Sequence, residues 1–151
     1  MSTKLQKLVL KDKKSYKTFI LSDINCENTF LNEVGNALKA GIDVVEFDGN
    51  RLSSKAFLST GKKLRDLSGV FNALLIIKDR IDIAKLVGAD GVTLYENSIP
   101  ISEAHKLVEE NLLIGFHAQE ETILDEQELS LLSFIISDKP INTDIKQFQP
   151  Q

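Results

Sequence analysis

The chain has 151 residues, of which 42% are hydrophobic and 26% charged. This length and balance predict one folded domain with a substantial core, and they exclude a chain that is disordered throughout. Its single cysteine, Cys26, excludes an internal disulfide, and the longest apolar runs are far shorter than the roughly 20 residues of a membrane helix. We therefore expect a soluble protein in a reduced, cytoplasmic setting, with no membrane partner.

The net charge of −4 is unevenly distributed. Residues 1–17 contain six lysines and one aspartate, so a basic segment precedes an acidic body. A basic arm that binds nucleic acid or a membrane surface is one interpretation. The segment is short and lacks interleaved aromatic residues, which favours an ordinary solvated segment and predicts no nucleic-acid partner.

From residue 18 onward, short β-branched or aromatic runs alternate with stretches of helical periodicity. The first half of this pattern predicts strands at residues 19–21, 42–47 and 73–77. Helices are expected between them, at residues 27–40 and 53–67. The run before residue 78 is continuously apolar, which is typical of a strand buried on both faces.

The next unit has clear boundary signals. A helix is predicted at residues 80–87, with Asp79 as its N-cap and Gly88 at its end, and a strand is predicted at residues 91–94. Pro100 suits the first turn of the helix that follows. The predicted buried face of that helix consists of Ile101, Ala104, Leu107 and Val108.

The remaining pattern predicts a strand at residues 112–116, an acidic helix at 120–129 and a strand at 132–137. Such alternation indicates a parallel sheet. We predict an α/β fold: a truncated TIM-barrel-like (β/α) fold with about six parallel strands, although a doubly wound sheet has a similar pattern. An open sheet exposes strand edges, so we expect a homo-oligomer, a partner protein or the chain's own tail to cover the edge.

Residues 75–94 read LIIKDRIDIAKLVGADGVTL. This run resembles the thiamine phosphate synthases and their thiazole tautomerase (TenI-like) relatives, in which Ile-Asn-Asp-Arg is followed at the same spacing by Gly-Ala-Asp-Gly-Val-His-Leu. Ile99-Pro100, Ile114-Gly115 and residues 143–146 add to the similarity. The resemblance implies a single domain at residues 18–146, between the basic segment at 1–17 and a polar tail at 147–151.

The synthase joins a pyrimidine diphosphate to a thiazole phosphate, with Mg²⁺ and basic residues stabilising the departing charge. The family's second strand ends in Gln-Leu-Arg-x-Lys, whereas this chain has Glu46, Asp48 and Asn50 at the polar positions. An acid and an amide therefore replace two cations, which indicates that synthase catalysis is lost or weak.

The resemblance implies that Asp79 is a metal ligand, because it matches the first of two family aspartates. The second falls on Ser98, and Glu96 is two positions from where a substitute ligand should stand. We expect Mg²⁺ to bind weakly or not at all, with no other cofactor. Capping of a helix is an alternative role for Asp79 that needs no metal.

After the fifth strand the family has Ser-x-His, and here His117 stands at the serine and Gln119 at the histidine. A short gap in the alignment would place His117 at the family histidine, and the resemblance then makes it the candidate catalytic residue, because tautomerase relatives use that histidine for proton transfer. The alternative is a histidine at the rim of the barrel without a chemical role. Lys78, at the family's asparagine, and Lys146, in the loop after the sixth strand, are the candidate substrate-binding residues.

Three hypotheses follow from these residues. The first is a degenerate family member that retains phosphate-ligand binding, with thiazole phosphate or thiamine phosphate as ligand. The second is an active thiamine-biosynthesis enzyme completed by oligomerisation, and the third is a regulatory or protein-binding module. Acids at predicted strand ends are expected to form an acidic rim that repels diphosphate; they are Asp23, Asp48, Asp79, Glu96 and Asp138.

Overall fold

The computed structural model describes residues 16–108, 110–119 and 121–137. These residues form a six-stranded parallel sheet in the sequential order β1-β2-β3-β4-β5-β6. The strands are β1 (Tyr16–Ile20), β2 (Val44–Asp48), β3 (Leu74–Lys78), β4 (Gly91–Leu94), β5 (Leu113–His117) and β6 (Phe134–Ile136). Sequential order without a reversal is the arrangement of a barrel rather than a doubly wound sheet, which confirms the predicted fold class.

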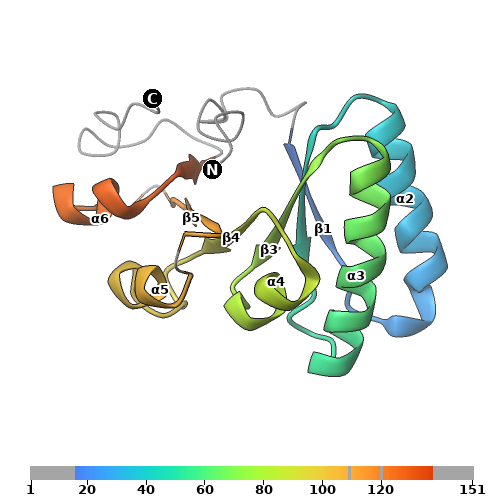
Figure 1. Ribbon diagram of the computed structural model, residues 1–151, viewed down its shortest axis with the longest axis horizontal. Coiled ribbons are helices and arrows are strands. Elements are labelled where there is room, and N and C mark those ends of the chain that lie inside the picture. The colour runs from blue at the N-terminus through green and yellow to red at the C-terminus, as the bar shows by residue number, and fades with distance from the viewer. Residues whose placement is uncertain (1–15, 109, 120, 138–151) are drawn as a thin grey trace.

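The helices follow their strands along the outer side of the curved sheet (Figure 1). They are η1 (Ile24–Cys26), α2 (Glu27–Lys39), α3 (Ser54–Val70), α4 (Ile81–Val87), α5 (Ile101–Val108) and α6 (Glu126–Leu131). Ser53 caps α3 by accepting a bond from Ala56 N, and Gly88 ends α4 with a left-handed φ of 73°. None of these helices combines the length and apolar character needed to cross a membrane.

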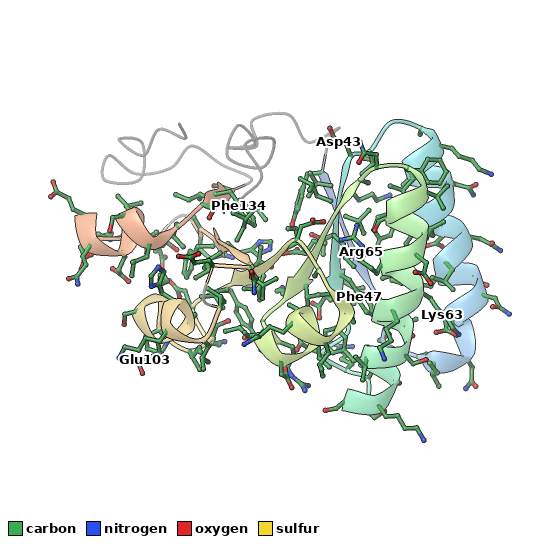
Figure 2. All side chains as sticks on the ribbon, viewed as in Figure 1. Asp43, Phe47, Lys63, Arg65, Glu103 and Phe134 are labelled. Atoms are coloured by element: carbon green, nitrogen blue, oxygen red, sulfur yellow. The ribbon has the colours of Figure 1, made fainter. Side chains whose placement is uncertain are left out.

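Two apolar clusters cover the two faces of the sheet. The larger one lies between strands and helices and includes Phe47, Phe57 and Leu64, each at most 1% exposed. The smaller one lies on the inner, concave face and consists of Val44, Leu74, Ile76, Leu113, Phe134 and Ile136. Figure 2 shows Phe47 near the helices and Phe134 on β6. Burial on both faces explains why strands such as β3 and β6 read as nearly continuous apolar runs.

Two glycines make room for large side chains on the inner face. A Cβ at Gly115 would lie 2.1 Å from the Phe134 ring, and a Cβ at Gly91 would lie 2.8 Å from the Leu113 carbonyl oxygen. Phe134 therefore packs directly on the β5 backbone. This contact fills part of the concave face with apolar side chains.

Three predicted features are wrong in detail. The acidic helix expected at 120–129 is α6, which begins at Glu126 because Asp125 and Glu128 form a capping box there. Leu107 is 52% exposed and does not belong to the buried face of α5. The first strand begins at Tyr16, inside the segment predicted to be solvated, because Tyr16 packs against the inner cluster.

Candidate active site

Glu46 is the centre of a hydrogen-bond cluster on the inner face. Its side chain is fully buried, and Oε1 accepts bonds from Tyr16 Oη at 2.7 Å and Thr18 Oγ1 at 2.6 Å. Its Oε2 accepts a bond from Thr93 Oγ1 and lies 2.6 Å from His117 Nε2. One carboxylate thus joins β1, β2, β4 and β5.

The surroundings of Glu46 keep it ionised. Burial by itself raises the pKa of a carboxyl group, but the hydrogen bond and charge of His117, with the hydroxyls of Thr18 and Thr93, lower the pKa of Glu46 to about 2. A fully buried acid that accepts this many bonds is stable only as the anion, because each neighbour must supply a proton.

His117 stands at the carboxyl end of β5, with its side chain 20% exposed. One ring nitrogen therefore contacts the buried carboxylate while part of the ring reaches solvent. Carboxyl ends of barrel strands are where active sites of this architecture form. The position suits a group that exchanges protons with a bound molecule.

A second cluster lies at the ends of β2 and β3. Lys78 Nζ is 3.6 Å from Asp48 Oδ2 and 5.0 Å from the centre of the Tyr95 ring. Asn50 donates from Nδ2 to Asp48 Oδ1 at 3.0 Å. The two side chains of the ion pair are 24% and 18% exposed, so the charge of Lys78 is largely offset by an adjacent acid.

Asp79 lies next to this cluster, in a strained conformation. Its φ is 71°, a left-handed value that aspartate tolerates better than most residues, and its Oδ1 accepts a bond of 2.6 Å from Ser98 Oγ. The predicted capping role is wrong, because Arg80 is the N-cap of α4 and makes no side-chain cap bond. The left-handed turn directs the Asp79 carboxylate to the β4 loop instead.

Magnesium binds one or two carboxylates together with waters or phosphate oxygens. Asp79 provides one carboxylate, and one of its oxygens already accepts the bond from Ser98. Across residues 16–137, apart from 109 and 120, no three His, Cys, Asp or Glu residues are grouped so that they could hold a metal ion. This donor set fits a magnesium centre poorly.

The acids predicted to form a rim have separate local partners. Asp23 caps η1 through Asn25 N, and Glu96 accepts a 3.4 Å bond from Thr122 Oγ1. Asp48 and Asp79 have the partners already given. Asp138 and Lys146, the remaining predicted residues, lie outside the described residues.

The predicted site residues within the described part of the chain thus lie in two separate places. Lys78 and Asp79 are consecutive at the end of β3, where each has its own polar partner, whereas His117 lies in the Glu46 cluster. Glu46 itself was not predicted as a site residue. A signal existed, since a glutamate between Val45 and Phe47 in a buried strand requires partners.

A sequence profile described as thiamine monophosphate synthase matches residues 18–151. The thiamine-phosphate synthase of Fusobacterium nucleatum is 28% identical over 137 residues, which are 89% of this chain and 66% of that protein. The thiamine-phosphate synthase of Dictyoglomus thermophilum is 30% identical over 112 residues, covering 71% of this chain and 50% of the relative.

Among solved structures, thiamine phosphate pyrophosphorylase from Pyrococcus furiosus superimposes with a TM-score of 0.64 at 25% identity. The match covers 88% of this chain and 64% of that one. The chain thus spans about half to two thirds of the length of these relatives. Profile, relatives and fold agree over most of the sequence, and the chain belongs to the thiamine monophosphate synthase family.

Proposed function

We propose that this chain binds a thiazole phosphate or thiamine phosphate at the carboxyl ends of its strands and does not catalyse the synthase reaction. Membership of the family supports a ligand of this class. The observation that carries the loss of catalysis is the ion pair of Asp48 with Lys78, at 3.6 Å. Asp48 stands where the resemblance implies an arginine.

Negative charge develops on the diphosphate as it leaves. Release of diphosphate requires cations close to the departing oxygens. At the end of β2 the side chains present are Asp48 and its hydrogen-bonded partner Asn50, and Lys78 is already paired with that acid. A monophosphate needs less compensation, which Lys78 and Lys146 provide in this proposal.

The role proposed for magnesium is correspondingly small. Asp79 is the residue that would hold the ion, which would supply positive charge beside the phosphate. The bond from Ser98 competes for one carboxylate oxygen. We expect Mg²⁺ to change ligand affinity little.

The test is formation of thiamine phosphate from the pyrimidine diphosphate and thiazole phosphate with Mg²⁺. The Fusobacterium nucleatum relative serves as positive control. We expect no product from this chain, and a gain of product in a variant with Asp48→Arg and Asn50→Lys. Turnover by the unmodified chain that disappears in Asp79→Ala would overturn the proposal.

A second candidate function is proton transfer of the thiazole tautomerase type, and the contact of His117 with Glu46 favours it. A histidine oriented by a carboxylate is a common acid–base arrangement. In this reaction a proton leaves one atom of the heterocycle and returns to another, so no cation for diphosphate is needed. Loss of tautomerisation in His117→Gln, with His105→Gln unchanged, would support it.

A further inference from the structure

We infer that Glu46 is a positioning residue for His117: it fixes the proton on Nε2 and thereby makes Nδ1 the nitrogen that exchanges a proton with a ligand. The inference deepens the proton-transfer candidate and rests on it for the ligand. Its first part, the state of the imidazole, stands on the contacts of Glu46 alone.

The state of the imidazole follows from the hydrogen-bond capacity of the Glu46 carboxylate. Each oxygen of an ionised carboxyl group has two lone pairs and no proton to donate. Oε1 of Glu46 receives Tyr16 and Thr18, and Oε2 receives Thr93 and faces His117 Nε2. Three hydroxyl donors thus occupy three acceptor sites, and because an ionised carboxylate has no proton to give, His117 Nε2 must donate to the fourth.

Only one arrangement of His117 satisfies that contact. If Nε2 carried a lone pair, it would face an anionic oxygen inside a fully buried cluster, which is strongly unfavourable. The proton therefore belongs on Nε2. In the neutral ring Nδ1 is then the acceptor. The His117 side chain is 20% exposed, so part of the ring is accessible to solvent.

The cluster also fixes the ring in space. Glu46 lies on β2, in register with Ile76 of β3, and reaches across the concave face to the end of β5. Its other three donors come from β1 and β4, so the carboxylate cannot turn toward a ligand without breaking several bonds. The structure thus assigns Glu46 to orientation and His117 Nδ1 to transfer, as in other carboxylate–histidine pairs.

The chain offers a simple test, because its two histidines are His117 and the exposed His105 on α5. With ¹⁵N-labelled imidazole rings, ¹H–¹⁵N correlation spectra of the full chain at alkaline pH report the tautomer of each ring. We expect a single Nε2–H tautomer with a slowly exchanging proton for His117. For His105 we expect a mixture of tautomers and a ring N–H signal that is lost because its proton exchanges rapidly with water.

Glu46→Leu removes the acceptor, and Glu33→Leu on the exposed side of α2 is the matched control. In Glu46→Leu we expect the tautomer mixture and proton exchange of His117 to resemble those of His105. In Glu33→Leu we expect the His117 spectrum to be unchanged. If Glu46→Leu does not fold, the unmodified chain still decides the matter. An Nδ1–H tautomer, or an averaged His117 signal in that chain, would overturn the inference.

Addition of thiazole phosphate then separates this inference from the proposed function. We expect the Nδ1 resonance of His117 to shift while the Nε2–H signal persists. A shift of Nε2 with loss of its proton would overturn the inference. If no resonance moves and no heat of binding is measured, the proposed ligand is wrong, while the ligand-free spectrum still tests the role of Glu46.

Discussion

Asp79 combines a left-handed backbone with a carboxylate that holds the β4 loop. Alanine at this position loses the bond from Ser98 and retains an unfavourable φ of 71°, whereas glycine loses the bond but adopts that φ freely. We expect Asp79→Ala to lower the free energy of unfolding by about 2 kcal/mol and Asp79→Gly by about half as much. Urea denaturation measures both. Equal losses would show that the backbone conformation contributes nothing.

Glu46 makes stability depend on pH in the acid range. Its pKa is about 2 in the folded protein, below the ordinary value of 4.5, so its contribution is complete above pH 4.5 and is lost as pH falls toward 2. This contribution to the free energy of unfolding is on the order of 3 kcal/mol. We expect the difference in free energy of unfolding between the unmodified chain and Glu46→Gln to shrink as the pH falls from 4.5 to 2.

Denaturation midpoints at several pH values measure that difference. Other acids with lowered pKa values, Glu27 and Asp82, titrate in both proteins and cancel in the comparison. A difference that stays constant from pH 6 to pH 2 would contradict the assignment of Glu46 as a buried anion.

Strand β5 depends on the absence of a side chain at Gly115. A Cβ there would lie 2.1 Å from the Phe134 ring, so Gly115→Ala must displace that ring or the strand. We expect a loss of about 3 kcal/mol. Gly35 in α2 has nothing within 4 Å of a built Cβ, and Gly35→Ala should be neutral or stabilise by about 0.5 kcal/mol.

Thermal unfolding of the two variants makes the comparison direct. Adding Phe134→Leu to Gly115→Ala should recover part of the loss, because the smaller side chain leaves room for the methyl group. If the Gly115 and Gly35 variants are equally stable, Phe134 does not pack on β5 as described.

Elements with strong local signals could be predicted from the sequence. The buried strands β3 and β4 are runs with few polar residues, and Gly88 marks the end of α4, so these were placed within a residue or two. The start of α6 was missed although Asp125 and Glu128 have capping-box spacing, because the acidic residues before them also fit a helix.

The candidate site was harder to predict, because its contacts are tertiary. Glu46 meets Thr18 and His117 across 28 and 71 residues of sequence, and only the curvature of the sheet brings them together. The capping role of Asp79 failed for a related reason. A positive φ at that residue is not visible in the sequence, and it redirects the carboxylate from α4 to Ser98.

The sheet has two edges in its described part, β1 and β6, each paired on one side. Unpaired strand edges favour association. We therefore expect a homo-oligomer in solution, and sedimentation equilibrium over a range of concentrations measures its mass. A monomer at every concentration would rule out completion of the sheet by a second copy.

In the proposed function, a ligand site remains at the carboxyl ends of the strands without the cations that diphosphate chemistry needs. Calorimetric titration of the purified chain with thiazole phosphate tests it most directly, with Asp48→Asn as a matched variant. We expect saturable binding that changes little with Mg²⁺ and strengthens severalfold in Asp48→Asn, because the acid beside Lys78 is neutralised. Absence of any binding at millimolar ligand, or binding that requires Mg²⁺, would contradict it.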